Sequence, residues 1–211
     1  MKRSKTLVLP NSLDARRFAY DPQVRAEVRR ELGVEGKFVL GMVGRLSEEK
    51  NFPFALRLMA RLRENHPDFV LVIAGNGEEE QKLKNMIGEL GIADQVQMLG
   101  RRSDVERLYQ AYDVFLLPSF HEGLGIAAVE AMAAGLPVLL SDAIPRELAF
   151  GSAVSYLPLK EPEAWIREIL RWPGDSKRPE RQHEPGENGL EIRKTAGLLE
   201  KLYLEDVSAG Q

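Results

Sequence analysis

Short apolar runs alternate with longer segments of helical spacing along most of this 211-residue chain. The apolar runs are rich in Val, Leu and Ile and predict strands at 37–43, 69–75, 96–100, 114–119, 137–142 and 153–159. The segments between them predict helices at 51–65, 78–91, 104–112, 125–134 and 161–172. Strands that are apolar throughout are buried on both faces, and their alternation with helices implies right-handed crossovers. The sequence therefore predicts an α/β fold with a doubly wound, Rossmann-like parallel sheet of about six strands.

Several residues mark where the predicted helices begin and end. Asn51 stands where a cap for the first crossover helix is expected, and Pro53 fits the first turn of that helix. Gly91 and Gly135 follow the last apolar positions of two later helices, which is typical of helix ends. A further helical stretch is expected near 22–32, before the first strand.

The domain organisation follows from where this alternation stops. We expect one ligand-binding domain over 1–172. Residues 173–187 contain three prolines and no large apolar side chain, which predicts a mobile linker or loop. Residues 188–211 contain an amphipathic segment, which predicts a terminal helix that packs on the domain or on a part of the protein outside this sequence.

Composition excludes several classes of function. Hydrophobic residues make up 44% of the chain, enough for a core, and the net charge of -3 does not favour a nucleic-acid partner. The chain has no cysteine, so thiolate metal sites are excluded, and its three histidines are too far apart in sequence to show metal-ligand spacing. No apolar run approaches the roughly 20 residues of a membrane span. These features favour a cytoplasmic protein without a transmembrane segment.

In a doubly wound sheet, ligands bind beyond the carboxyl ends of the strands. The informative segments are therefore those that follow the first four predicted strands, at 44–51, 75–80, 100–104 and 119–125. Each contains glycine, and the first and third also contain arginine.

The first of these segments places Arg45 and Lys50 beside Gly44. The planar fork of arginine and the point charge of lysine would suit a diphosphate. The alternative is that both are ordinary surface charges partnered by Glu48 and Glu49.

The segment after the fourth strand leads directly into a helix. Free backbone N–H groups near Leu124, Gly125 and Ile126 would form an anion site at the start of that helix. The dinucleotide motif G-x-G-x-x-G does not follow the first strand, and the P-loop motif is absent from the sequence. The sequence therefore predicts a generic phosphate-binding helix start rather than a dinucleotide-binding loop or a P-loop.

Two glutamates, Glu122 and Glu130, flank this helix start in an otherwise apolar and alanine-rich stretch. A helical wheel puts Glu130 at the margin of an apolar face formed by Ile126, Val129, Met132 and Ala133. A carboxylate can accept two hydrogen bonds from vicinal hydroxyls, so Glu130 would suit a ribose and Glu122 a sugar. The alternative for Glu130 is a solvated helix edge.

Four motifs in order carry a resemblance to a known family. They are "VLPNSLDARRF" (8–18), "GRLSEEKN" (44–51), "LVIAGNGEEEQKLK" (71–84) and the stretch from "VQMLG" to "PVLLSD" (96–142), which holds the two glutamates with seven residues between them. In order and spacing they resemble the C-terminal, donor-binding domain of the GT-B glycosyltransferases, specifically retaining family 4, glycosyl transferases group 1. Two further phrases, "SDAIPRELAF" and "EIRKTAGLLEKLYLE", resemble members that build capsular polysaccharide or exopolysaccharide.

The resemblance implies one half of a GT-B fold and a role for individual residues. Arg45 and Lys50 would hold the donor diphosphate, Glu122 the donor sugar, Glu130 the ribose, and the loop at Arg101 would lie near the base. The implied donor-binding set is Gly44, Arg45, Lys50, Arg101, Glu122, Gly123, Leu124, Gly125, Ile126 and Glu130, with Glu122, Arg45 and Lys50 as the catalytic members. His121 is expected to be a variable loop residue.

The resemblance also implies a metal-independent reaction with a nucleotide diphosphate sugar, a UDP-sugar rather than a GDP-sugar. The acceptor would be a saccharide or a lipid-linked saccharide, and the full-length protein could lie peripherally at the inner membrane face. A GT-B enzyme has two such domains, so this chain is expected to be a truncated form that lacks the N-terminal domain and transfer activity. Two alternatives remain: a non-catalytic α/β interaction module, and a GT-B sugar-nucleotide epimerase or phosphorylase.

Overall fold

The computed structural model describes residues 13–123, 125–146, 153–172, 196–197 and 200–201. The predicted linker at 173–187 lies outside the described residues. Of the predicted terminal helix, Ala196, Gly197, Glu200 and Lys201 are described, and all four are helical. How that helix packs therefore stays a prediction.

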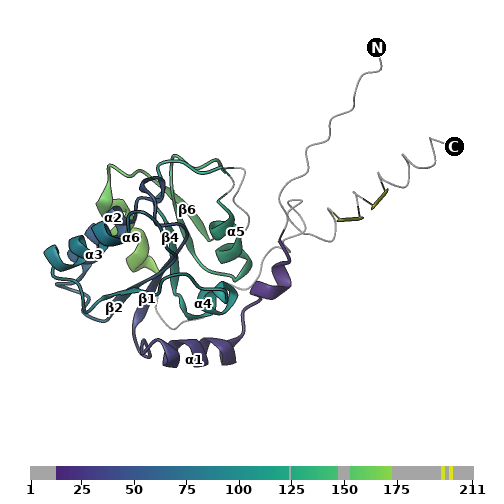
Figure 1. Cartoon of the computed structure of the whole chain (residues 1–211), viewed down its shortest axis with the longest axis horizontal. Helices are drawn as coiled ribbons and strands as arrows, with labels where there is room; N and C mark the ends of the chain where they lie inside the picture. Colours follow the sequence, from purple (N-terminus) through teal and green to yellow (C-terminus); the bar gives the residue numbers. More distant parts are fainter. Residues whose placement is uncertain (1–12, 124, 147–152, 173–195, 198–199, 202–211) are drawn as a thin grey trace, which may run out of the picture.

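A six-stranded parallel sheet forms the centre of the described domain (Figure 1). Its strand order is β3-β2-β1-β4-β5-β6, and all five neighbouring pairs run parallel. The strands are β1 (Phe38–Val43), β2 (Phe69–Ala74), β3 (Val96–Met98), β4 (Val114–Leu117), β5 (Val138–Ser141) and β6 (Val154–Leu157). The predicted fold class is confirmed, although β3 ends two residues before the expected boundary.

Helices cover both faces of this sheet. Figure 1 shows α2 (Phe52–Leu62), α3 (Glu80–Glu89) and α6 (Pro162–Arg171) on one side and α1 (Pro22–Glu31), α4 (Val105–Ala111) and α5 (Ile126–Ala133) on the other. Two short 3-10 turns, η1 (Ala15–Phe18) and η2 (Glu48–Lys50), were not anticipated from the sequence. Gly91 and Gly135 adopt positive φ after α3 and α5, as expected for helix ends.

Alternate residues of each strand enter two separate hydrophobic cores. Val39 of β1 packs in the core under α1, α4 and α5, whereas its neighbour Leu40 packs in the core under α2, α3 and α6. Trp165 of α6 is fully buried in the second core, with its ring edge against Phe54 at 5.1 Å between centroids. Burial on both faces explains why the strands read as continuous apolar runs.

The sheet reverses its winding between β1 and β4, which are neighbours although two strands and three α-helices separate them in the chain. Such a reversal is where ligands bind in open α/β sheets, at the carboxyl ends of the strands. The segments that follow β1 and β4 are therefore the ones to compare in detail.

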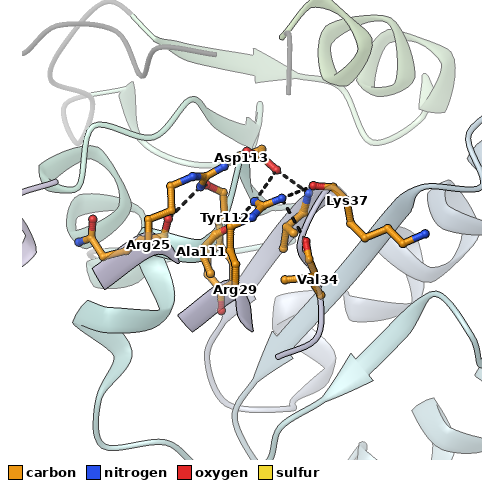
Figure 2. Close-up of polar contacts among 9 residues, drawn as sticks. Arg25, Arg29, Val34, Lys37, Ala111, Tyr112 and Asp113 are labelled. Atoms are coloured by element: carbon orange, nitrogen blue, oxygen red, sulfur yellow. Dashed lines mark hydrogen bonds and ion pairs between the residues drawn. The ribbon is translucent and has the colours of Figure 1, made fainter. Parts of the chain in front are cut away.

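An ion-pair cluster lies at the opposite, amino-terminal end of the same two strands (Figure 2). Arg25 and Arg29 of α1 both bond to Asp113, which immediately precedes β4. The carboxylate of Asp113 also accepts a hydrogen bond from the backbone N–H of Val39 at 2.7 Å. This cluster, called the α1 clamp below, ties a helix to both central strands.

Candidate functional site

Two hydrogen bonds join the segments that follow β1 and β4. The backbone N–H of Phe120 donates to the carbonyl of Glu49 at 2.8 Å. The side-chain amide of Asn51 donates to the carbonyl of Pro118 at 3.0 Å. Because both bonds cross the point where the sheet reverses, they fix the two loops against each other.

Lys50 and Glu122 form an ion pair across the same point. The ammonium of Lys50 lies 2.6 and 2.8 Å from the two carboxylate oxygens of Glu122, whose residue is only 7% exposed. The hydroxyl of Ser119 donates to Glu122 Oε1 at 2.7 Å, and Ser141 donates to the carbonyl of Ser119. The partner of Lys50 is therefore Glu122, and the alternative that assigned it to Glu48 or Glu49 is wrong.

Ser119 and Ser141 were missed by the sequence reasoning. Both residues are fully buried. Ser119 lies two residues after the end of β4, and Ser141 is the last residue of β5. A serine at that position in "LLPSF" was the available signal, because buried hydroxyls need partners.

A cleft of about 610 Å³ lies at the carboxyl ends of β1, β2 and β3. Gly44 in its lining connects it to the Lys50–Glu122 pair, since a Cβ there would lie 3.8 Å from Lys50 Cε. It is lined by Val43, Gly44, Arg45, Ala74, Gly75, Asn76, Gly77, Glu78, Arg101, Arg102 and Val105. A Cβ on Gly75 would lie 1.8 Å from the carbonyl oxygen of Gly44, and one on Gly77 would lie 2.4 Å from that of Leu46. The floor of the cleft therefore depends on glycine, because the loops after β1 and β2 are in backbone contact.

The arginines of the cleft differ in how they are paired. Arg45 donates to Glu78 at 3.1 Å, and Arg102 makes two bonds to Asp104 at 2.8 and 2.7 Å. Those bonds from Arg102 lower the pKa of Asp104 below its usual value. Among the described residues Arg101 is exposed and has no ion-pair partner. Arg101 could therefore bind a ligand without first breaking an ion pair, unlike Arg45 and Arg102.

Helix α5 begins at the edge of the loop that carries Glu122. Its N-cap, Gly125, adopts a left-handed backbone (φ 53°), and no side chain caps the first turn. Gly123 has open space around its Cα, and Leu124 lies outside the described residues. Ile126 is 50% exposed, so its predicted place on the apolar face is wrong. Ala128, Val129, Ala131, Met132 and Ala133 face the core instead.

Glu130 is held by a neighbouring helix. The hydroxyl of Tyr109 on α4 donates to Glu130 Oε2 at 2.8 Å and approaches the carbonyl of Ala127 at 3.1 Å. Burial raises the pKa of Glu130 above its usual value, although the bond from Tyr109 opposes that shift. A fully solvated helix edge is therefore wrong for Glu130.

The predicted site residues fall into three groups. Gly44, Arg45 and Arg101 line the large cleft. Lys50 and Glu122 pair at the reversal point, and the start of α5 leads from there to Glu130. A smaller cleft of about 350 Å³ shares Glu78 with the large one and is bordered by the exposed ring of Phe120. His121 is exposed, as expected for a loop residue.

Within the described part of the chain, no group of three or more histidine, aspartate or glutamate side chains could hold a metal ion. In the same residues, no helix has the length and apolar character needed to cross a bilayer. The expectation of a metal-independent reaction stays a prediction.

Comparison with known proteins gives the same family at several levels. Putative glycosyltransferase EpsF of Bacillus subtilis is 33% identical over 96% of this chain and 54% of its own length. An Escherichia coli protein named UDP-Gal:alpha-D-GlcNAc-diphosphoundecaprenol alpha-1,3-galactosyltransferase is 37% identical over 65% of this chain and 37% of its own length. The chain thus spans about half, or less, of these relatives.

Solved structures share the fold. The Anabaena protein Alr3699/HepE in complex with UDP superposes with a TM-score of 0.74 and 22% identity, covering 94% of this chain and 57% of that one. An isolated C-terminal domain of a Francisella tularensis group 1 glycosyl transferase, LpcC, gives a TM-score of 0.64 at 19% identity, covering 76% of this chain and 88% of that one. The sequence profile described as Glycosyl transferases group 1 matches residues 24–191. The chain therefore belongs to the group 1 glycosyltransferase family, with one Rossmann-like half of the GT-B fold.

Proposed function

We propose that this chain is the donor-binding domain of a retaining glycosyltransferase that uses a nucleotide diphosphate sugar. The observation that carries the proposal is the Lys50–Glu122 pair at the reversal point, directly beside a glycine-floored cleft. A nucleotide in that cleft would bring its phosphates to the carboxyl ends of β1 and β4. Arg101 would then lie near the base.

In this proposal the cations stabilise the departing nucleotide. Transfer breaks the bond between the anomeric carbon of the sugar and the diphosphate oxygen, and it forms a bond from that carbon to the oxygen of an acceptor hydroxyl, which gives up its proton. Negative charge collects on the leaving diphosphate. Lys50 and Arg45 would exchange their carboxylate partners for phosphate oxygens, and the uncapped first turn of α5 would add backbone N–H groups. Glu122, relieved of Lys50, would accept hydrogen bonds from the donor sugar.

Glu130 would bind the ribose through the oxygen that Tyr109 does not hold. The hydroxyl of Tyr109 donates to Oε2. Two vicinal hydroxyls need a carboxylate in a fixed orientation, which this bond supplies. Helix α5 would therefore contact the donor at both of its turns, the phosphates at the first and the ribose at the second.

We infer a UDP-sugar as donor and a saccharide or lipid-linked saccharide as acceptor. The name of the E. coli relative includes UDP-Gal and a diphosphoundecaprenol acceptor, and the Anabaena structure contains UDP. Since the chain matches about half of such proteins, the acceptor site would lie on a second domain, and residues 1–211 alone would bind donor without transferring it. The protein would then work in the cytoplasm, at the membrane face when the acceptor is lipid-linked.

A thermal-shift screen of UDP- and GDP-sugars tests the proposal. A donor that binds only the folded state stabilises it by RT ln(1 + c/Kd) at a free donor concentration c, so the melting temperature rises with the logarithm of c once c exceeds the Kd. We expect a UDP-sugar to raise it, and expect Lys50→Ala and Glu130→Ala to abolish the shift. If no nucleotide sugar produces a shift at millimolar concentration, donor binding by this chain is excluded.

A further inference from the structure

Asn51 is the only non-glycine residue among those described that has a positive φ, at 52° with ψ at 43°. Most residues other than glycine pay about 1–2 kcal/mol in this left-handed region, and asparagine enters it more readily than most because its short amide can form local hydrogen bonds. Asn51 stands at the predicted N-cap position of α2, but its side chain does not make the expected capping bond, and its conformation needs another explanation.

The left-handed backbone connects two elements of different character. Before it, η2 is a single turn that ends at Lys50, and the N–H of Asn51 closes that turn on the carbonyl of Glu48 at 3.1 Å. After it, α2 is anchored in the core through Phe52 and Leu56. Asn51 thus sets the angle between η2, the turn that carries Lys50, and the rigid helix α2 that follows it.

The amide of Asn51 supplies a second constraint. Its bond to the carbonyl of Pro118 reaches the loop that carries Glu122, 67 residues further along the chain. Asn51 is 4% exposed and Pro118 is buried as well, so the bond is shielded from water. Without that donor, the carbonyl of Pro118 would lose a hydrogen bond that is costly to leave unmade.

We propose that Asn51 is a positioning residue that holds the ammonium of Lys50 in register with Glu122, and so with the donor diphosphate. Its backbone sets the direction of η2, and its amide joins the backbone bond from Phe120 to Glu49 in fixing the distance between the two loops. The role rests on the proposed donor-binding function for its effect on ligand affinity. The geometry of the pair itself does not depend on that function.

Three substitutions separate the two contributions. Asn51→Gly keeps the left-handed backbone at no steric cost and removes the amide. Asn51→Asp keeps the shape and tolerates the backbone but points an oxygen at the Pro118 carbonyl. Asn51→Ala removes the amide and also disfavours the backbone, so the difference between Asn51→Ala and Asn51→Gly reports the strain.

Two measurements test the role on the purified chain. In the first, UDP titrated by calorimetry should bind Asn51→Gly and Asn51→Asp about tenfold more weakly than the unmodified protein. In the second, mass spectrometry should follow acylation of Lys50, with exposed Lys160 as the internal reference. Asn51→Gly should speed labelling of Lys50 several-fold relative to Lys160, because the ion pair loosens. Urea titration checks that the variants remain folded.

The outcomes separate this role from the proposed function. Unchanged UDP affinity and unchanged Lys50 labelling in a folded Asn51→Gly would overturn the positioning role. Faster labelling in a protein whose parent binds no UDP would support the role and overturn the donor-binding proposal instead. Weaker UDP binding without faster labelling of Lys50 would also overturn the positioning role, because Lys50 would then be held by contacts other than those of Asn51.

Discussion

The two ends of β1 and β4 carry buried ion pairs with opposite properties. At the amino ends, Arg29 is 5% exposed and donates to Asp113 and to the carbonyls of Ala111, Val34 and Lys37. At the carboxyl ends, the side chain of Lys50 is 23% exposed, and both of its hydrogen bonds go to one carboxylate. The guanidinium of Arg29 therefore has several backbone partners besides its carboxylate, whereas the ammonium of Lys50 has one carboxylate as its partner.

This difference separates a structural ion pair from one that can exchange. The guanidinium in the α1 clamp could bind a ligand only if several backbone carbonyls lost their donor, which is costly inside a protein. Lys50 could move to a phosphate by leaving one carboxylate, which Ser119 would still hold. A buried cation that also donates to several backbone carbonyls therefore indicates a role in fold stability. A cation whose only partner is one carboxylate beside a cleft indicates a role in ligand binding.

The largest effect is expected at the α1 clamp. Asp113→Ala leaves the guanidinium groups of Arg25 and Arg29 without their shared carboxylate. Removing one partner of a buried pair costs about 3–5 kcal/mol, so urea denaturation should show a loss of that size in the free energy of unfolding. The isosteric control Asp113→Asn, which keeps an acceptor for Val39, should lose less. A greater loss in Lys50→Met than in Asp113→Ala would contradict the comparison.

The carboxyl-end pair should respond in ligand binding more than in stability. Glu122→Gln removes the charge that holds Lys50, with a stability cost of about 1–3 kcal/mol. UDP should bind this variant at least as tightly as the parent, because Asn51 still holds the two loops together and Lys50 no longer has to leave a carboxylate. A UDP-sugar should lose affinity relative to UDP, because its hydroxyls lose an acceptor. Calorimetry with both ligands checks this, and an equal loss for both would argue that Glu122 does not touch the sugar.

The hydrogen bond from Tyr109 to Glu130 extends the comparison to a pair whose donor is neutral. Tyr109→Phe removes the hydroxyl that Glu130 and Ala127 share. We expect a loss of about 1 kcal/mol in the free energy of unfolding, since one neutral donor is lost. Ribose recognition should suffer as well, so uridine should bind more weakly. Chemical denaturation and a uridine titration measure the two effects, and an unchanged uridine affinity would separate Tyr109 from the ligand site.

The smallest effect is a pH dependence from Glu130. Burial raises its pKa in the folded state above the usual 4.5, so the folded protein holds this proton more tightly than the unfolded chain does. The contribution of Glu130 to stability should therefore fall as pH rises from about 4.5 through the raised pKa, and then level off. Comparing unfolding free energies of the parent and Glu130→Gln across that range isolates the fall, which the variant should lack. Parallel curves would show that Glu130 ionises as freely in the fold as outside it.

The fold was predictable because its signals are local. Continuous apolar runs predicted strands, which the structure buries on both faces. Gly91 and Gly135 predicted helix ends, because glycine readily adopts the positive φ that both residues have in the structure. Most of the candidate site residues also followed from one rule, since ligands bind beyond the carboxyl ends of parallel strands.

The pairings in the site were not predictable, because they depend on strand order. Lys50 and Glu122 are 72 residues apart and meet because β4 lies next to β1, which the alternation of strands and helices does not specify. The exposure of Ile126 was missed for a different reason. In a helix made largely of alanine, a helical wheel finds apolar residues on several sides and cannot tell which side packs.

The central claim is that Lys50 holds a diphosphate at the carboxyl ends of β1 and β4. Calorimetric titration of the chain and of Lys50→Met with UDP and with uridine tests it most directly, because uridine lacks the phosphates. The account predicts that Lys50→Met weakens UDP binding by about tenfold or more and leaves uridine binding unchanged. Equal UDP affinity in the two proteins, or an equal loss for UDP and uridine, would contradict it.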